Sequence, residues 1–507
     1  MKKPICYCRR MLFLLALVCL ASSAQQTCVA QDSAPKKANP AEAFYRSDEV
    51  QTVHLTIDPQ ELKRMQAALP ERISVKGSFR WNDISLDNVA IRYKGNSSSG
   101  PKQQHKRSYL VKFNEYESEQ RFLGLRRASF DNCVQFGSLF SEPIITEILR
   151  DQGIPAHRCN YAKLFLNGEY QGVYGNVERI DETFLENHLP DPKGLLFKVD
   201  EGGPGGNLQF LGDDPELYAH TFEPETKLSK QSQEQLIGFI KRINQSKPGE
   251  FAKQFDAKME SDDFLRVTSV LLLAGAFDQL TGWNPHNYYL YHDGTHERWR
   301  YLPWDLDVGF CEVAFGQIRV LDEWNAAWPI PGPPPNPLLE QIVADPQLLK
   351  RYRTEALKIL DKYFEPEQLC AKIDAKYALI KEALREDPFP PRRITNPSDK
   401  SHEDIIASMK TFIRKRYASA HQQLENPDPR PAVTHRPQQG PPIQLMMKGQ
   451  RVQKAAEAMV RAGKDISPIQ KVMQKVGPQL QQGKLNEAEK LVDEALQVVE
   501  QLQKEGK

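Results

Sequence analysis

Residues 273–310, LAGAFDQLTGWNPHNYYLYHDGTHERWRYLPWDLDVGF, carry the side chains on which the interpretation of this chain depends. An acid, Asp278, follows an apolar segment, and Asn287 opens an aromatic stretch. After a turn and a second such stretch come Asp305 and Asp307, which form a D-x-D pair. Carboxylate and amide oxygens suit magnesium, and alternate residues of an extended segment share a face. We therefore expect Asp305 and Asp307 to reach one metal ion, with a candidate base nearby.

The N-terminal residues have the pattern of a secretory signal peptide. A basic segment is followed by an apolar run at 11–21, too short to span a bilayer, and then by small residues. This predicts a signal peptide over 1–30, cleaved after Ala24 or Ala30, and export to the periplasm, cell envelope or extracellular space. An uncleaved anchor is the alternative. Residues 31–47 are polar and predicted to be a disordered linker.

Net charge and cysteine spacing argue against several classes of function. The net charge of +1 gives no basis for nucleic-acid binding, and the mature chain has no second hydrophobic segment that would span a membrane. The cysteines lack the C-x-x-C spacing of zinc sites. Disulfides are possible in an exported protein, but the sequence does not pair them. The cysteines beyond the signal peptide are Cys133, Cys159, Cys311 and Cys370.

Hydrophobic periodicity predicts an α+β organisation in two lobes. Short alternating runs over 50–113 indicate strands, with a helix at 58–69, and apolar residues at helical spacing indicate a helix at 138–151. Asn167-Gly168 between two apolar runs predicts a hairpin. These elements form an N-lobe over about 48–183.

The remainder is predicted to be mostly helical. Helices are expected at 233–244, 264–277, 337–386 and 402–424, within a C-lobe over about 184–425. Proline crowds the next segment, 426–444, which predicts an extended linker. Residues 445–507 have helical periodicity and predict a helical hairpin or three-helix unit, too small to carry chemistry by itself and a possible contact to an envelope partner.

Several blocks together resemble the CotH family, known first from a spore-coat protein, whose members are atypical secreted or surface protein kinases. The blocks are IRYKGNSSSG (91–100), KRSYLVKFN (106–114), LFLNGEYQGVYGNVERID (164–181), HNYYLYHD (286–293) and WRYLPWDLDVGF (299–310). The resemblance covers roughly 48–420 and leaves the C-terminal helical unit outside. It implies a two-lobed atypical protein-kinase-like fold that binds ATP with Mg²⁺ or Mn²⁺ and phosphorylates Ser or Thr in an acceptor protein that it does not name.

The resemblance assigns roles within the 273–310 block. Protein kinases carry a catalytic-loop Asp, an Asn, two short strands and a magnesium-binding Asp in this order. Asp305 takes the place of the principal metal ligand, with Asp307 beside it. Asn287 is the second ligand, with Asn284 as its rival. Asp278 is the candidate base, although nine positions separate it from Asn287 and the usual H-R-D motif is absent.

The nucleotide-binding residues are less well defined by the sequence. Lys112, in SYLVKF, has the setting of the lysine that holds the phosphates, and Lys94 and Lys106 are alternatives. Its acidic partner on the 138–151 helix is Glu147, or else Glu142. Glu178 closes the hairpin at the place where a kinase hinge would contact adenine; a surface charge is the alternative.

Two function classes follow from these observations. The first is an exported atypical Ser/Thr protein kinase that uses ATP and a divalent metal. The second is a non-catalytic cell-envelope binding module, either a pseudokinase or an adhesin with a metal-stabilised core. A phosphodiesterase or nuclease is a distant third, because it would need ligands among His286, His292 and His296, and the last two are expected in a turn.

Overall fold

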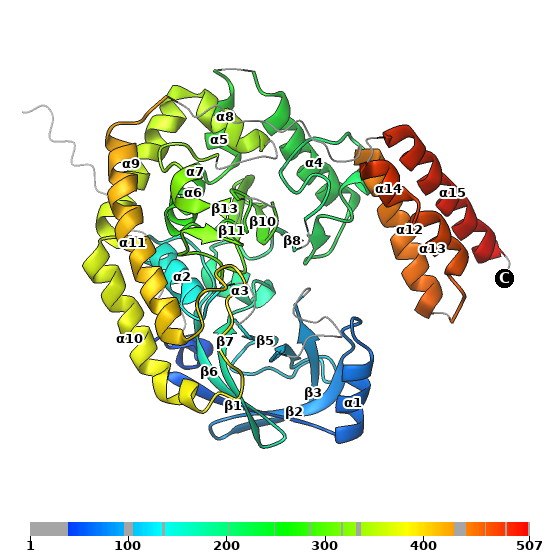
Figure 1. Cartoon of the computed structure of the whole chain (residues 1–507), viewed down its shortest axis with the longest axis horizontal. Helices are drawn as coiled ribbons and strands as arrows, with labels where there is room; N and C mark the ends of the chain where they lie inside the picture. Colours follow the sequence, from blue (N-terminus) through cyan, green and yellow to red (C-terminus); the bar gives the residue numbers. More distant parts are fainter. Residues whose placement is uncertain are drawn as a thin grey trace, which may run out of the picture. The chain divides into compact units, whose positions relative to one another are not determined.

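A computed structural model confirms the α+β class, with a β-barrel, a second sheet among helices, and a helical C-terminal region (Figure 1). The predicted signal peptide, residues 1–30, and most of the linker after it lie outside the described residues. The structure describes residues 39–95, 105–133, 137–200, 202–247, 249–282, 285–315, 318–330, 336–429, 443–461, 463–481 and 484–504.

A closed barrel forms the N-terminal part, with the strand order β1-β2-β3-β4-β5-β7-β6. Strands β1 and β6 are parallel, and the other neighbours are antiparallel. Asn167 and Gly168 join β6 to β7 with positive φ values of 51° and 86°, as the hairpin prediction requires. The strands are β1 (Val50–Ile57), β2 (Val75–Trp81), β3 (Ile84–Lys94), β4 (Ser108–Lys112), β5 (Arg127–Asp131), β6 (Cys159–Leu166) and β7 (Glu169–Val177).

The two faces of the barrel wall differ in chemistry. Aromatic rings fill the interior, where Phe44 contacts Phe79 and Phe122 edge to face. Because side chains alternate across a strand, the residues between the inward-pointing ones face outward. Lys94 pairs in register with Ser108, and Asp131 with Gly175, so these residues lie on the outer face. This outer face carries the charged side chains of the site described below.

Helix α1 (Pro59–Ala67) lies beside β2 (Figure 1), and Asp58 caps it by accepting bonds from the Gln60 and Glu61 amides. The second sheet has the order β11-β10-β8-β9. Its strands are β8 (Leu195–Val199), β9 (Glu223–Pro224), β10 (Tyr288–Asp293) and β11 (Arg298–Pro303). A short ribbon of β12 (Val313–Ala314) and β13 (Ile318–Arg319) follows.

An apolar core joins the second sheet to the helices around it. Helix α6 is buried without interruption from Val267 to Ala274 and packs against α2 and α9. The predicted 337–386 region is several helices, which restart at Pro346 and Pro366 because proline fits the first turn of a helix but not its interior. The helices are α2 (Ser141–Asp151), α3 (Glu182–His188), α4 (Lys230–Gln245), α5 (Phe251–Lys258), α6 (Ser261–Ala274), α7 (Val320–Glu323), α8 (Pro337–Ala344), α9 (Pro346–Tyr363), α10 (Pro366–Arg385) and α11 (His402–Glu425).

The C-terminal helices have an apolar cluster of their own, which includes Val452, Ala488 and Val492. They are α12 (Ile443–Arg461), α13 (Ser467–Met473), α14 (Val476–Gln481) and α15 (Leu485–Lys504). The sequence predicted a helical hairpin or a three-helix unit here, whereas the structure divides this region into the helices α12 to α15. Most of the proline-rich segment lies outside the described residues.

Within the described part of the chain, no helix combines the length and the apolar character needed to cross a membrane. Cys133, Cys159, Cys311 and Cys370 are buried free thiols. Because burial removes them from solvent and raises the pKa of each thiol, they are packing residues in this structure.

Candidate active site

The segment that carries Asp305 is not an extended strand, contrary to the expectation for the D-x-D pair. Strand β11 ends at Pro303, and Asp305 has a φ of 57°, in the left-handed region that non-glycine residues rarely adopt. Hydrogen bonds hold the backbone on both sides. Gln279 Nε2 donates to the Trp304 carbonyl at 2.8 Å, and the Leu306 amide donates to Glu142 Oε1 at 3.3 Å. The Asp305 side chain is therefore directed by tertiary contacts rather than by strand alternation.

Asp307 is held by a close approach of two backbone segments. The Ser138 amide donates to the Asp307 carbonyl at 3.0 Å. A Cβ atom on Gly137 would lie only 1.8 Å from that carbonyl oxygen, so the site needs glycine at this position. The start of α2 and the segment around Asp305 are consequently locked together.

The electrostatic environment of Asp305 and Asp307 favours the binding of a cation. Surrounding protein raises the pKa of Asp305; Lys94 lowers it, and the acids Glu142 and Asp131 raise it further. Desolvation and the charge of Asp305 likewise raise the pKa of Asp307. Asp305 is nevertheless exposed to solvent and Asp307 is half-buried. Two neighbouring carboxylates that remain open to solvent have the character of a ligand-binding site rather than of a core.

Asp278 and Asn287 are in direct contact, as residues that share one site should be. Asn287 has a φ of 57° and is buried, and its Nδ2 donates to Asp278 Oδ2 at 3.2 Å and to the Asp278 carbonyl at 3.1 Å. His286 Nε2 lies 3.5 Å from Asp278 Oδ1. Burial raises the pKa of Asp278, which His286 and the Asn287 bond partly offset. A carboxyl group with a raised pKa is suited to accept a proton near neutral pH. The rival Asn284 lies outside the described residues.

A lysine does lie near Asp305, where its charge lowers the pKa of that carboxyl group, but it is Lys94 rather than Lys112. The Lys94 ammonium forms an ion pair with Asp131 on the outer face of the barrel and lies 5.7 Å from the centre of the Trp304 ring. Lys112 is at the other end of β4, where its ammonium bonds to Glu115 at 3.2 Å. The VAIK-like sequence around Lys112 was misleading because strand register, and not local sequence, decides which lysine faces Asp305.

The other sequence candidates for nucleotide binding are also engaged elsewhere. Lys106 is buried and bonds to Asp387 at 2.8 Å, and Glu147 bonds to Lys376 at 2.5 Å. The alternative acid, Glu142, is the one that lies near Asp305, where it also contacts His157 at 2.8 Å. The geometry therefore favours Glu142 over Glu147.

Glu178 is a structural residue of the barrel. Its carboxylate is buried, with Arg158 Nη2 at 2.6 Å and His188 Nε2 at 3.1 Å. This leaves it no free oxygen at an adenine contact. Burial acts to raise the pKa of Glu178, but His188 and Arg158 outweigh this and lower it to about 2.

A lowered carboxyl pKa stabilises the folded state above the pKa of the unfolded chain and ceases to do so as the pH falls toward the folded value. We expect the unfolding free energy to drop by about 2 kcal/mol between pH 4.5 and pH 2 because Glu178 becomes protonated. In Glu178→Gln, the unfolding free energy should not show this part of the decrease between pH 4.5 and pH 2. Urea unfolding of both proteins across this range measures the difference, and parallel curves would contradict the assignment.

The sequence did not identify a cluster of arginine side chains near Asp305. Burial, followed by the charges of Arg72, Arg179 and Arg127, lowers the pKa of Arg92 to about 10, so these guanidinium groups lie close together. The sequence signal that was available is spacing: Arg92 and Lys94 are two residues apart on β3 and share its outer face.

Arg179 is notable within this cluster. Its guanidinium lies 4.8 Å from the centre of the Trp304 ring, and Nη2 is 3.4 Å from the Tyr289 hydroxyl. Its Nε is buried without a hydrogen-bond partner among the described residues. A buried N–H group without an acceptor is unfavourable, so a ligand that supplies one, such as a phosphate oxygen, would be stabilised there.

The donor set fits magnesium only as part of a shared site. No three acidic, histidine or cysteine side chains within the described ranges gather closely enough to hold a metal ion by themselves. Magnesium is commonly bound by one or two carboxylates together with substrate phosphates and water. Asp305 and Asp307, with the Oδ1 atom of Asn287, match that pattern. Desolvation, and after it the neighbouring acids, raises the pKa of both carboxyl groups, which a bound cation would offset.

Comparison with known proteins identifies the family of this chain. The family model described as CotH kinase protein matches residues 91–420, a somewhat shorter range than the 48–420 expected from the sequence blocks. The inner spore coat protein H of Bacillus subtilis (strain 168) is 23% identical over 346 residues, which cover 66% of this chain and 88% of that protein. Because the match includes more than half of the chain and the whole candidate site, this protein belongs to the CotH family.

Proposed function

We propose that this protein is an atypical Ser/Thr protein kinase that transfers the γ-phosphate of ATP to a protein acceptor with the help of a divalent metal. One observation carries the proposal. Asp305 and Asp307, the Asp278–Asn287 pair and the Lys94–Asp131 pair converge on the segment after β11, although they come from separate parts of the chain. Phosphoryl transfer requires this combination of metal ligands, phosphate-binding cation and hydroxyl-orienting acid.

Each residue has a definite task in this proposal. Mg²⁺ or Mn²⁺, when bound, would neutralise charge on the triphosphate. Asp305, Asp307 and Asn287 supply the protein oxygens that hold it. Lys94 and the neighbouring Arg179 contact phosphate oxygens. Asp278 accepts a hydrogen bond from the acceptor hydroxyl, orients it for in-line attack and takes its proton as the bond to phosphorus forms.

The protein's location is part of the same proposal. The curated relative is a spore coat protein by name, and the N-terminal sequence has the signal-peptide pattern. We infer that the chain works outside the cytoplasm, in the envelope or beyond it, on an acceptor protein there. An N-terminal fragment identified by mass spectrometry of the mature protein would test this, with cleavage after Ala24 or Ala30 as the expected result.

Incubation with γ-labelled ATP and Mg²⁺ or Mn²⁺ tests the activity, with label on the protein or on an added acceptor as the readout. Lys94→Met should reduce kcat/KM for ATP about a hundredfold, since it removes a charge from the phosphates. Lys112→Met should stay within about twofold of the parent, because among the residues that the structure describes the Lys112 side chain bonds to the neighbouring, partly exposed Glu115. Equal impairment of the two variants would contradict the lysine assignment.

Lys94→Met also leaves Asp131 without its ion-pair partner, so a stability control is needed. Thermal unfolding of Lys94→Met, Lys112→Met and the parent should be measured in the same buffer. A lower kcat/KM at a temperature where all three proteins remain folded assigns the effect to phosphate binding.

A further inference from the structure

His157 is a fully buried histidine in the connection between α2 and β6, and the kinase function proposed above gives it no task. Hydrogen bonds hold its backbone and that of the next residue. Arg150 Nη1 donates to the His157 carbonyl at 2.6 Å, and the Arg158 amide donates to Glu178 Oε2 at 3.0 Å. The imidazole is polar, however, and a polar group in the interior needs a partner of its own.

Glu142, in the first turn of α2, is the partner of this imidazole. His157 Nε2 lies 2.8 Å from Glu142 Oε1, and the two side chains are 0% and 2% exposed. Burial acts to raise the pKa of Glu142, but the hydrogen bond and charge of His157, and then the charge of Lys94, outweigh this and lower it. Glu142 is therefore a carboxylate that accepts the bond, and His157 Nε2 donates it. His157 Nδ1 has no hydrogen-bond partner among the described residues.

The same carboxylate oxygen holds the backbone beside the candidate metal ligands. Glu142 Oε1 accepts a hydrogen bond from the Leu306 amide at 3.3 Å, in addition to the bond from His157. Leu306 follows Asp305, whose φ of 57° is retained only where surrounding contacts impose it. Because both bonds end on one oxygen, the position of the imidazole determines where the Leu306 amide finds its acceptor.

The imidazole also supports Trp304, on the other side of Asp305. The ring centres of His157 and Trp304 are 5.0 Å apart, with an angle of 55° between the planes. The Trp304 ring in turn lies 4.8 Å from the Arg179 guanidinium and 5.7 Å from the Lys94 ammonium. His157 therefore packs against the residue that contacts both cations of the candidate site.

We propose that His157 is a positioning residue for phosphate transfer: its bond to Glu142 fixes the acceptor of the Leu306 amide and so holds the Asp305 carboxylate where it meets the metal. The inference rests on the kinase function proposed above. His157 is buried, so it acts through Glu142 and the backbone rather than by touching the nucleotide or the acceptor. Groups that orient a ligand in this way influence metal affinity and activity although they do not contact the metal.

Loss of the donor should rearrange the charges around Glu142. A buried carboxylate is stable only while it keeps partners. Lys94 is close enough to lower the pKa of Glu142, so without His157 the carboxylate should turn toward that ammonium. This movement would weaken the ion pair of Lys94 with Asp131 and would take the acceptor away from the Leu306 amide.

Three variants of His157 separate the donor from the bulk of the side chain. The amide nitrogen of glutamine is as many bonds from Cα as histidine Nε2, whereas that of asparagine is one bond closer. His157→Leu and His157→Asn should lower kcat for phosphate transfer about tenfold and leave KM for the acceptor peptide unchanged. His157→Gln should recover most of the activity, because it returns a donor to the place of Nε2. Equal activity of the Gln and Asn variants would contradict the proposal, and this comparison holds even where His157→Leu does not fold.

Amide hydrogen exchange, followed by mass spectrometry without nucleotide or metal, reports on the Leu306 amide directly. A peptide that contains residues 304–310 should exchange faster in His157→Leu and His157→Asn than in the parent, because the amide has lost its acceptor. In His157→Gln it should exchange at nearly the parent rate. Unchanged exchange in the Leu and Asn variants would overturn the proposal. Since no phosphate transfer enters this measurement, a protein that labels no acceptor would count against the kinase function alone.

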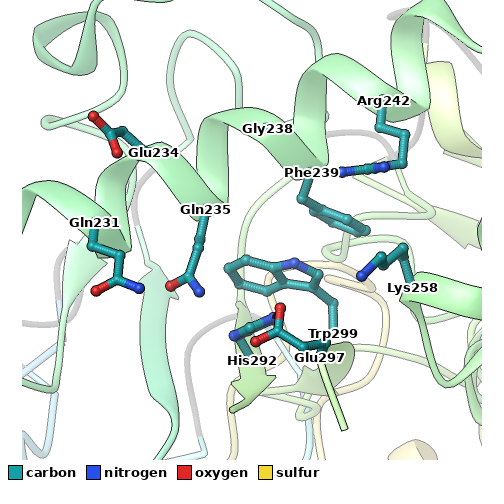
Figure 2. A pocket seen from close by; sticks show the side chains of 10 residues that line it. All are labelled: Gln231, Glu234, Gln235, Gly238, Phe239, Arg242, Lys258, His292, Glu297 and Trp299. Carbon is teal, nitrogen blue, oxygen red and sulfur yellow. Dashed lines mark ion pairs between the residues drawn. The ribbon is translucent and has the colours of Figure 1, made fainter.

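His292 provides the matched control. It is also a buried histidine, 4% exposed, and its ring lies 4.8 Å from that of Trp299 beside a pocket below α4 (Figure 2). His292→Leu removes a buried imidazole away from the candidate active site, so it should lower the midpoint of thermal unfolding and leave kcat and the exchange of residues 304–310 unchanged. All variants are compared at a temperature where each remains folded. Equal effects of His292→Leu and His157→Leu on exchange would assign them to a general loss of packing and would overturn the proposal.

Discussion

Asp305→Ala is expected to reduce phosphate transfer roughly a thousandfold. Asp305 is exposed to solvent, yet desolvation by the surrounding protein, and after it the neighbouring acids, raises its pKa to about 8. Its charge is therefore unfavourable in the empty protein and becomes favourable only when a cation binds. Removal of the carboxylate should eliminate both metal binding at this position and the alignment of the γ-phosphate. Label transfer from γ-labelled ATP, measured beside the parent protein, gives the size of the loss.

Asp305→Asn distinguishes a functional acid from a structural one. It retains the shape of the side chain and removes the charge, so activity should fall nearly as far as in the alanine variant. The midpoint of thermal unfolding in EDTA should equal or exceed that of the parent, because an unfavourable charge has been removed. A markedly lower midpoint would identify Asp305 as a structural residue. Retained activity would exclude it as a metal ligand.

Asp387→Ala should cause the largest loss of stability, about 3–5 kcal/mol. Asp387 Oδ2 accepts bonds from Lys106 Nζ at 2.8 Å and from the Val173 amide at 2.9 Å, and the Lys106 and Asp387 side chains are only 1% and 3% exposed. Removal of the carboxylate leaves the buried Lys106 ammonium without its counter-charge, with the Val173 carbonyl at 2.6 Å as its remaining acceptor, and leaves the Val173 amide without the acceptor it has in the parent. Urea unfolding, followed by circular dichroism, measures the change.

Two further variants test the physical cause of that loss. Asp374→Ala breaks an ion pair with Lys410 in which the acid is 56% exposed, and it should cost no more than about 1 kcal/mol. Addition of Lys106→Met to Asp387→Ala should restore part of the stability, because the unpaired charge is then gone. A double variant that is less stable than Asp387→Ala would show that Lys106 has another stabilising role.

The local sequence was sufficient to predict most secondary-structure elements. The helix expected at 58–69 is α1, the one at 138–151 is α2, and the Asn167-Gly168 hairpin joins β6 to β7. These elements follow from periodicity, caps and turn residues within a few positions of one another, and such signals do not depend on distant contacts. The 337–386 region was predicted as one range because its prolines occupy helix starts without interrupting the apolar pattern.

The contact between Asp278 and Asn287 and the nearness of Asp305 to Asp307 were also predictable, because these residues lie within one block of sequence. The strand-like geometry expected for Asp305 was wrong. Its left-handed φ is imposed by bonds from Gln279 to Trp304 and from Leu306 to Glu142. No pattern in the D-x-D pair itself contains that information.

The sequence by itself determined the family, the α+β class and the acids of the candidate site. Only the tertiary structure decided which distant residues join them: Lys94 instead of Lys112, Glu142 instead of Glu147, and Lys106 as the partner of Asp387 rather than of a nucleotide. The physical reason is that strand register and helix packing determine which side chains meet across the barrel and the helices. Both result from the burial of the whole apolar surface rather than from the residues beside each charge.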